Sequence, residues 1–472
     1  RRRMLRISAI FLMLAALIAP ASAGELDDFV AAQMRDSALP GVAWAVVDGD
    51  KVTTGAQGLV EKGSDEPVTG ETRFLVGSIS KSFTALAVMQ LAEAGKLDID
   101  QPVSLYIGDF AHKPAGAITL RQLLNHTSGF STLQGNSAPS ESESLPDAIS
   151  RRAAWYAQQE PDHAPGSRWE YSNANYLILG RVIEAVSGQP YPAYIEDHIL
   201  QPLGMEHTTV AGAGERPAMA SGHVPWFGSM RRIDPQWVGL GSAPQGGIVS
   251  TASDLARYLQ MMMNGQGDIL SAAGKAQMLA PASDASPGYG FGWMLDTEEQ
   301  SAYHTGLSPG FESIAAMIPA KKRGVVVLTN GVSGMGFAET TQLRYGLVAK
   351  ALDLPPPGDT GRGMRIANYL ALGIAPVILL LAMVWAWVKR DAVRAKRASA
   401  FGRFSLWFPL VAMAAVAWMC VAVIPQLFGV SLSTLSLFQP DMALLLQATA
   451  VLGMVWAVVR LGIAHGGQSA RG

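Results

Sequence analysis

Residues 77–95 read GSISKSFTALAVMQLAEAG, and this stretch predicts a helix. Its longer side chains recur at spacings of three and four residues, at Phe83, Leu86, Met89 and Gln90. Gly95 is a typical residue for the end of a helix, so we expect the helix to cover residues 78–94. It begins with the pattern S-x-x-K, which places Ser78 and Lys81 on the same helical face, one turn apart.

Ser78 and Lys81 are candidates for a nucleophile and its base. A serine hydroxyl is a poor nucleophile unless a base takes its proton. A lysine can be that base only if burial and neighbouring charge lower its pKa from ~10.4 towards neutrality. The N-terminus of a helix also favours negative charge developing on the serine oxygen. The pattern alone is common by chance, and a solvated serine and lysine are its ordinary interpretation.

Two further motifs follow in the chain. The first is Tyr171-Ser172-Asn173, and the second is His304-Thr305-Gly306. The three motifs together resemble the serine β-lactamase and penicillin-binding protein family, in which S-x-x-K precedes Y-x-N and then K-T-G or H-x-G on a strand beside the site.

Other stretches between residues 26 and 350 resemble the same family, especially its class C and D-aminopeptidase branch. They are residues 123–129 (LLNHTSG), 165–180, 202–205 (PLGM), 246–251 (GGIVST) and 288–293 (GYGFGW). Many separately spaced matches coincide here, which makes the resemblance specific.

The resemblance implies a role for each motif residue. Ser78 would be acylated. Lys81 and Tyr171 would form the proton relay, with Tyr171 as a phenolate beside the ammonium. Asn173 would hydrogen-bond a substrate amide. The backbone N–H groups of Ser78 and Leu307 would form the oxyanion hole, where each donor typically contributes ~2.7–4 kcal/mol in the transition state.

The resemblance also implies two substrate-binding positions, Gln134 and the third motif. Gln134 lies where class C enzymes place a glutamine that contacts the substrate. The third motif, with Thr305 and Gly306, has His304 where antibiotic-degrading relatives have lysine. A histidine with a pKa near ~6.5 supplies the expected positive charge only in part. We therefore expect poor β-lactam turnover, and the motif fits the esterase, D-aminopeptidase and amidase relatives better.

The order of predicted elements indicates an α+β fold. Strands are expected at residues 42–47 and 51–59 and again at 313–318 and 324–329, at the two ends of the domain. Helices are expected between them, at residues 120–124, 176–186 and 255–263, with a short one before them at 27–34. This predicts an antiparallel sheet flanked by helices with an inserted helical subdomain, the β-lactamase/transpeptidase-like fold that the resemblance implies.

The first residues predict a secretory signal peptide over residues 1–23. Arginines at positions 1, 2, 3 and 6 precede an apolar run at residues 7–19 and the small residues 21–23. An uncleaved N-terminal anchor is the alternative.

Three apolar runs near the C-terminus predict transmembrane helices. Residues 368–388, 406–430 and 442–459 carry no charge and are about as long as a span requires. Six lysines and arginines lie between the first two runs, whereas residues 431–441 contain none. The basic connector is expected in the cytoplasm, so the large domain lies on the periplasmic side of a bacterial cytoplasmic membrane. The signal peptide predicts the same orientation.

These observations divide the chain. A serine hydrolase domain is expected at residues 24–352, a Pro- and Gly-rich linker at 353–365, a three-helix transmembrane region at 366–463 and a cytoplasmic tail at 464–472.

Composition excludes several classes of protein. The net charge is −2, and the long middle region has no basic patch, so nucleic-acid binding is not expected. The single cysteine, Cys420, forbids an intramolecular disulfide, and the histidines show no ligand spacing, so neither a metal nor another cofactor is expected. The expected partners are membrane lipid and a small-molecule, peptide or acylated-peptide substrate. The oligomeric state is left open.

Two other motifs have simpler explanations. Residues 306–310 read GLSPG and match the lipase elbow G-x-S-x-G, but Pro309 lacks the N–H that the elbow's oxyanion hole uses. We interpret them as a turn. His126, within Asn-His-Thr-Ser-Gly, is expected to make local hydrogen bonds in a tight turn.

The sequence therefore favours an exported hydrolase that forms an acyl-enzyme on a small amide, peptide or ester. A narrower version is a D-amino peptidase that trims an acylated precursor, because the layout resembles membrane-bound peptidases that activate prodrugs; simple anchoring is the alternative role for the helices. A cell-wall D,D-carboxypeptidase would use the same chemistry. A non-catalytic penicillin-binding-like sensor or scaffold is the alternative outside enzymes.

Overall fold

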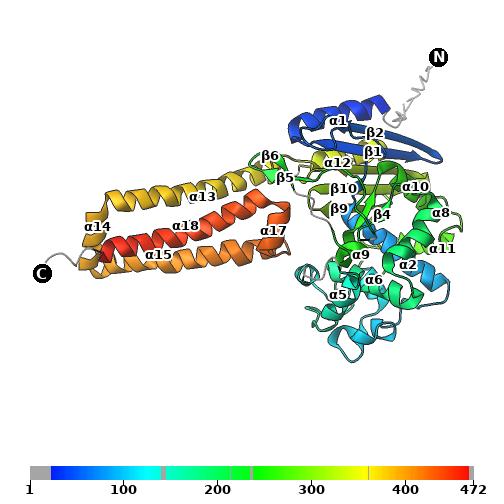
Figure 1. Cartoon of the computed structure of the whole chain (residues 1–472), viewed down its shortest axis with the longest axis horizontal. Coiled ribbons are helices and arrows are strands. Elements are labelled where there is room, and N and C mark those ends of the chain that lie inside the picture. The colour runs from blue at the N-terminus through cyan, green and yellow to red at the C-terminus, as the bar shows by residue number, and fades with distance from the viewer. Residues whose placement is uncertain (1–22, 140–144, 213, 234–237, 360, 467–472) are drawn as a thin grey trace, which may run out of the picture.

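The computed structural model describes residues 23–139, 145–212, 214–233, 238–359 and 361–466. It shows an α+β domain joined end-on to a rod of long helices (Figure 1). The predicted signal peptide lies outside the described residues except for Ala23, and so do residues 467–472 of the predicted tail.

A six-stranded antiparallel sheet forms the centre of the domain. Its strand order is β2-β1-β11-β10-β9-β8. The strands are β1 Gly41–Asp48, β2 Lys51–Gly58, β8 Met294–Asp296, β9 Ser301–Ser308, β10 Phe311–Ile318 and β11 Arg323–Thr329. The strand β1 pairs with β2 on one side and with β11 on the other, so strands from the two ends of the domain form one sheet, as the sequence predicted.

Helices cover both faces of this sheet. The helices α1 Ala23–Ser37 and α12 Thr341–Leu352 pack on one face, with Val325 and Val327 in their core. The helices α2 Ser80–Glu93 and α10 Ala252–Met263 lie in the larger core on the other face, which contains Val326 and Leu328. Burial on both faces explains why the middle of β11, residues 325–328, is a continuous run of apolar residues.

The inserted subdomain surrounds α2. Its helices are α3 Leu120–Leu124, α4 Thr132–Gly135, α5 Ala148–Ala157, α6 Asn173–Ser187, α7 Tyr191–Ile195, α8 Gln201–Leu203, α9 Ala243–Gly246 and α11 Ala272–Met278. Short strands β3 Phe74–Leu75, β7 Ile248–Ser250 and β4 Thr209–Val210 form a second sheet, and β5 His223–Trp226 with β6 Ser229–Arg232 form a hairpin.

The helix predicted over residues 78–94 begins as a 3₁₀ turn at Gly77–Ile79, followed by α2. Nearly every side chain of α2 is buried, including Lys81. The helix is therefore the central packing element of the domain.

Three helices of the rod are long and apolar enough to cross a membrane. They are α13 Arg362–Val388, the continuous segment Ala400–Leu427, and α18 Pro440–His465. The middle segment comprises α15 Ala400–Trp418, a π-turn at Met419–Val423 and α16 Ile424–Leu427. The helix α18 packs against both α13 and α15 (Figure 1).

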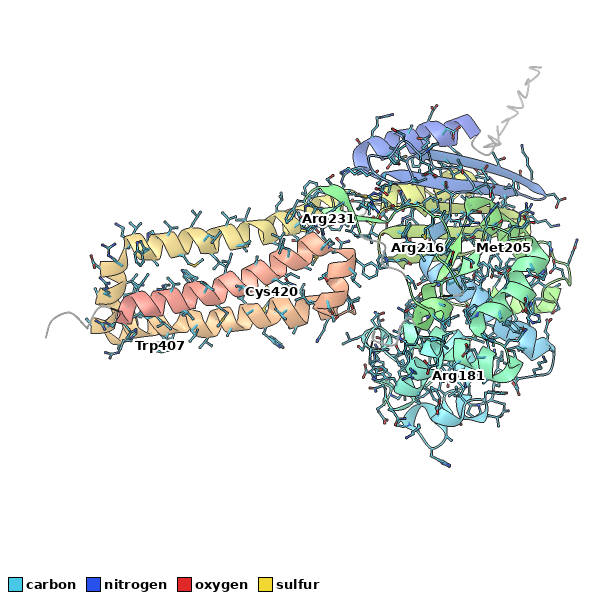
Figure 2. The ribbon with its side chains drawn as sticks, viewed as in Figure 1. Arg181, Met205, Arg216, Arg231, Trp407 and Cys420 are labelled. Carbon is cyan, nitrogen blue, oxygen red and sulfur yellow. The ribbon has the colours of Figure 1, made fainter. Side chains whose placement is uncertain are left out.

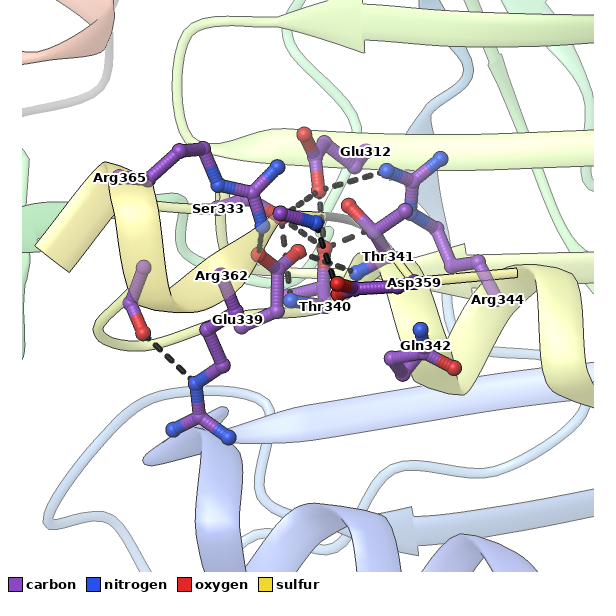
Figure 3. Close-up of polar contacts among 12 residues, drawn as sticks. Glu312, Ser333, Glu339, Thr340, Thr341, Gln342, Arg344, Asp359, Arg362 and Arg365 are labelled. Atoms are coloured by element: carbon purple, nitrogen blue, oxygen red, sulfur yellow. Dashed lines mark hydrogen bonds and ion pairs between the residues drawn. The ribbon is translucent and has the colours of Figure 1, made fainter. Parts of the chain in front are cut away.

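Short helices lie in both connectors of the rod: α17 Leu432–Phe438 in residues 431–441, and α14 Arg390–Ala395 in the basic connector. The helix α13 begins at Arg362, inside the segment expected to be a linker. Arg362 Nε donates to the Gly336 carbonyl at 2.9 Å, and Arg365 pairs with Glu339, so contacts with the domain fix the first turn (Figure 3).

Further polar contacts join the rod to the domain. Gln439 Nε2 donates to the Ser333 carbonyl at 2.6 Å, and Asn136 Nδ2 donates to the Gly429 carbonyl at 2.9 Å. The connector between α16 and α18 is thus held against the domain.

Candidate active site

The site forms where the start of α2 meets β9. Gly77 has a φ of +55°, and a Cβ placed on it would lie 2.5 Å from the backbone nitrogen of Leu307. Only glycine accepts both this conformation and this approach. Gly306 is likewise packed against the backbone of Val76. The two glycines therefore let the Ser78 turn lie directly against the strand.

Lys81 lies at the centre of a polar cluster. Its Nζ lies 3.0 Å from Ser78 Oγ, 2.8 Å from Asn173 Oδ1 and 2.8 Å from the carbonyl oxygen of Gln245. Burial holds the pKa of Lys81 well below its usual value. As a neutral amine it can direct its lone pair at Ser78 while donating to the other two oxygens. The arrangement suits a base for the serine proton.

Tyr171 approaches the same serine from the other side. Its hydroxyl shares a hydrogen bond with Ser78, and its ring centroid lies 4.9 Å from Lys81 Nζ. Burial raises the pKa of Tyr171, which favours the neutral phenol. The resemblance implied a phenolate here. The structure instead presents a hydroxyl that can pass a proton in either direction.

His126 packs against Tyr171 and hydrogen-bonds to the segment that carries it. Its Nδ1 accepts hydrogen bonds from the backbone N–H of Ser172, at 3.2 Å, and from Asn175 Nδ2, at 2.9 Å. Its ring lies 4.4 Å from the Tyr171 ring, centroid to centroid, and burial lowers the pKa of His126. His126 has a φ of +59°, which agrees with the expected tight turn, but its side chain bonds to residues 46 and 49 positions later, so the expectation of local hydrogen bonds is wrong. The sequence did not reveal that these bonds hold the Tyr171 segment.

His304 lies beneath the site. It is buried; its Nδ1–H donates to the Thr305 carbonyl at 2.6 Å, and its Nε2 lies 3.1 Å from the Tyr289 hydroxyl. Burial lowers the pKa of His304 to about 3. The sequence-based expectation of a partly charged histidine is therefore wrong, because the imidazole is packed against aromatic side chains and is neutral.

Leu307, the residue directly after the third motif, reaches the cavity. Its side chain is half exposed, on the free end of β9 beyond its pairing with β8. Pro309 and Gly310 connect β9 to β10 in a hairpin, so the G-x-S-x-G match is a turn between two strands and not a strand-to-helix elbow.

The structure places Gln134 away from the substrate space. Its Nε2 donates to the Glu160 carbonyl at 2.7 Å, and its Oε1 accepts from the N–H groups of Ser131 and Asp162 at 3.1 and 3.2 Å. It belongs to a capping box at the start of α4. The expectation that Gln134 contacts substrate is corrected, because all of its polar atoms are used in holding this loop.

Asn136, two residues later, lies in the site instead. Its Oδ1 accepts from Asn173 Nδ2 at 2.8 Å, while its own Nδ2 binds the connector before α17. It thus joins the Y-x-N motif to the rod of helices. No spacing pattern in the sequence marks Asn136 or the carbonyl of Gln245.

A cavity of about 340 Å³ opens beside Ser78. Its walls come from several segments of the domain and from α17. The lining residues are Ser78, Asn136, Ala138, Arg152, Asn173, Val238, Ser242, Gln245, Gly246, Leu307, Ser308 and Pro309, with Thr434, Leu437 and Phe438 of α17. The connector between two long apolar helices therefore forms one wall of the cavity that contains the candidate nucleophile.

A serine, a lysine one turn later and a tyrosine that share hydrogen bonds in an α+β domain are the arrangement of serine hydrolases that use an S-x-x-K motif. The chain belongs to the beta-lactamase family, since residues 26–350 match the family model described as Beta-lactamase. The resemblance inferred from the motifs is thereby confirmed.

Known proteins show the same relationship. Protein flp of Staphylococcus aureus (strain MW2) is 27% identical over 317 residues, which are 65% of this chain and 62% of flp. The chain thus matches less than two thirds of the length of that relative. The octameric penicillin-binding protein homologue from Pyrococcus abyssi superposes with a TM-score of 0.61 at 26% identity, covering 71% of this chain and 78% of that one. A D-stereospecific amidohydrolase from Streptomyces sp. superposes with a TM-score of 0.53 at 26% identity. The superposition covers 66% of this chain and 94% of that one.

Proposed function

We propose that the protein is a membrane-anchored serine hydrolase that forms an acyl-enzyme on Ser78 and cleaves a small amide, peptide or ester. The observation that carries this proposal is the convergence of Lys81 and Tyr171 on one serine hydroxyl, with the pKa of Lys81 lowered by burial. A base poised near neutrality is what serine activation requires.

The reaction follows from these contacts. The Lys81 amine takes the proton of Ser78 as Oγ attacks the substrate carbonyl carbon. The N–H groups of Ser78 and Leu307 stabilise the oxyanion. The bond to the leaving amine or alcohol then breaks, and Tyr171 passes that group a proton that Lys81 replaces. Water, deprotonated by the same pair, attacks the acyl carbon and releases Ser78.

Asn173 holds the base in this scheme. Its Oδ1 accepts from Lys81, and its Nδ2 donates to Asn136. Both ends of the amide are therefore used in the free enzyme, and a substrate amide that bound Asn173 would have to displace one of these partners.

The neutral state of His304 favours amides and esters over β-lactams. The lysine of antibiotic-degrading relatives provides a fixed positive charge near the substrate carboxylate, and His304 provides none. The likeness to a D-stereospecific amidohydrolase supports the same substrate class.

We further infer that the substrate carries an acyl group and that the domain faces the extracytoplasmic side of a bacterial membrane spanned by the three helices. Leu307, Val238, Leu437 and Phe438 give the cavity an apolar wall, and two of them belong to α17, beside those helices. An acylated peptide partitions into lipid and would reach this wall from the membrane surface.

The experiment uses the full chain reconstituted in lipid. A fluorophosphonate probe should label the wild type, and labelling should disappear in Ser78→Ala. Ser308→Ala, which removes a second serine of the same cavity, should still be labelled. A Ser78→Ala protein that keeps both labelling and turnover contradicts the proposal.

A substrate panel refines the assignment. It comprises N-acyl-D-amino-acid amides, their L-isomers, simple esters, a chromogenic cephalosporin and cell-wall peptides. We expect turnover of the acylated D-amides. A stable adduct that never hydrolyses would instead favour a non-catalytic sensor.

A further inference from the structure

The β5–β6 hairpin lies at the junction between the domain and the domain-side end of the helical rod (Figure 1). Phe227 and Gly228 form its tip, with φ values of +47° and +85°. Such two-residue turns strongly favour Asn-Gly or Asp-Gly. A phenylalanine in the left-handed region is unusual, and this one leaves 49% of its surface exposed. Packing within the domain therefore does not explain its presence.

The tip is fixed to the start of the rod. The N–H of Phe227 donates to Asp441 Oδ2 at 3.0 Å, and the same buried oxygen accepts from the Tyr369 hydroxyl of α13 at 2.6 Å. The apolar stretch of α18 begins at the next residue, Met442. The exposed Phe227 ring is thus held at the level where α18 enters its apolar span.

A cationic side chain lies beside this tip. Arg231 is exposed and stacks its guanidinium 3.7 Å from the centre of the Trp226 ring (Figure 2 labels Arg231 at the junction). Within the described part of the chain, no carboxylate lies in ion-pair range of Arg231, whereas the neighbouring Arg232 pairs with Glu61 at 2.8 Å. Arg362 is exposed at the first turn of α13. Aromatic rings beside cations are typical of the membrane–water interface.

We propose that the hairpin tip is a second lipid-binding surface of the protein. Phe227 and Trp226 lie in the interfacial layer of the outer leaflet, and Arg231, with Arg362, binds the phosphates of anionic phospholipids. The proposal rests on the proposed span of the membrane by α13, α15 and α18. A partner that offers apolar chains and phosphates at one depth explains the strained tip and the Arg231 guanidinium, which has no ion-pair partner among the residues that the structure describes.

The contact would fix the tilt of the catalytic domain. His223, at the base of β5, donates from Nδ1 to the Asn330 carbonyl at 2.8 Å, directly after β11. The hairpin is therefore braced against the central sheet as well as against Asp441. Two lipid-facing supports, the rod and the tip, would hold the domain at a constant height, with the Ser78 cavity near the lipid surface.

The test places one fluorophore at the tip. In the full chain with Cys420→Ala, Phe227→Cys is labelled with an environment-sensitive dye and reconstituted in vesicles. Two matched positions are labelled separately. Val377→Cys reports from the middle of α13. Lys51→Cys reports from the exposed start of β2. Lys51 and Gly58, at the two ends of β2, are seven residues apart, which is on the order of 20 Å along the strand.

Lipids with a nitroxide near the headgroup should quench the Phe227 label at least about twofold more than the Lys51 label, as interfacial residence requires. Arg231→Glu should reduce that quenching in vesicles that contain phosphatidylglycerol, and Arg231→Lys should preserve it. Vesicles of phosphatidylcholine alone should give a smaller difference between these variants.

Three outcomes overturn the proposal, and they are distinguishable. If the Val377 label is quenched by nitroxides deep in the acyl chains but the Phe227 label behaves like the Lys51 label, the rod spans the membrane and the tip does not touch it. A Phe227 label that is shielded from water yet not quenched by lipid would assign the tip to a protein contact. If the Val377 label is not quenched, the membrane span itself is wrong.

Discussion

Asn173 Oδ1 lies 2.8 Å from Lys81 Nζ, so a direct hydrogen bond joins the second motif to the first. The bond fixes the amine between Ser78 and the Gln245 carbonyl. Because the Asn173 side chain is a neutral amide, it adds no charge beside Lys81 and does not favour the ammonium form as a carboxylate would.

Asn173→Asp should therefore shift the pH dependence of catalysis. A carboxylate beside Lys81 favours the ammonium and raises the pKa of Lys81, typically by about 1–3 units at this range. The amine form would appear only at higher pH, so the acid limb of kcat/KM should move upwards by about the same amount. Stopped-flow or steady-state profiles of both proteins measure the shift.

Asn173→Ala is the control for this shift. It removes the hydrogen bond without adding charge, so its kcat should fall while the limb stays close to the wild-type position. An Asn173→Asp profile with an unchanged midpoint would mean that Lys81 is not the group whose deprotonation limits the reaction.

Gly77→Ala tests the close approach of α2 to β9. A methyl group there would collide with the Leu307 nitrogen and would occupy a φ of +55°. We expect the oxyanion site to be displaced, with a loss of kcat on the order of 10²–10³-fold, as for the removal of one oxyanion donor. Steady-state turnover and thermal unfolding should be measured together.

Gly95→Ala separates the two effects. Gly95 also has a positive φ, +67°, but no atom lies within 4 Å of its added Cβ. The Gly95→Ala variant should lower the free energy of unfolding through backbone strain alone and leave kcat unchanged. Equal kcat losses in the two variants would contradict a specific role for the Gly77 contact.

His304 should make the domain sensitive to acid. The pKa of folded His304 is about 3, so it stays neutral, while an unfolded histidine takes up a proton below ~6.5. The unfolded state then binds more protons, and the free energy of unfolding should fall as pH decreases from ~6.5 towards 3, by at most about 1.4 kcal/mol per pH unit from this residue.

His304→Gln tests this linkage by differential scanning calorimetry between neutral and acidic pH. The variant starts less stable, because it loses packing against Tyr289, but its stability should fall less steeply with acid than that of the wild type. His126, whose pKa burial also lowers, remains in both proteins. Parallel curves for the two proteins would show that His304 titrates normally.

The sequence predicted the sheet and the three motifs because both depend on local patterns. Strand-like runs marked β1, β2, β10 and β11, and the spacing S-x-x-K at the start of a helical pattern placed Ser78 and Lys81 on one helical face. What remained hidden depends on tertiary packing. The charge of His304 is decided by its burial near Tyr289, which lies 15 residues earlier in the chain.

Gln134 shows where a local signal was available. Ser131 and Gln134 form an S-x-x-Q capping box, which commits the glutamine side chain to the backbone before any substrate arrives. For α17 no such signal exists. Its contribution to the cavity depends on how the rod docks on the domain through Asn136, Ser333 and Asp441, and sequence spacing carries no information about that docking.

The α17 wall should select for long acyl groups. Replacing Leu437 and Phe438 together by serine removes two apolar side chains from the cavity. Full burial of one such side chain is worth about 1.5–3 kcal/mol, so KM for a long-chain N-acyl substrate should rise on the order of 10- to 100-fold. KM for the N-acetyl analogue should hardly change, because its acyl group does not extend to α17.

Ser433→Ala is the matched control on the same helix. Ser433 is exposed and does not line the cavity, so this variant should keep the wild-type preference for chain length. Unfolding temperatures of all three proteins in the same lipid establish that the rod stays docked. If Leu437 and Phe438 can be replaced without any change in the ratio of kcat/KM for long and short acyl chains, α17 closes the cavity without contacting the substrate, and the helices serve as an anchor.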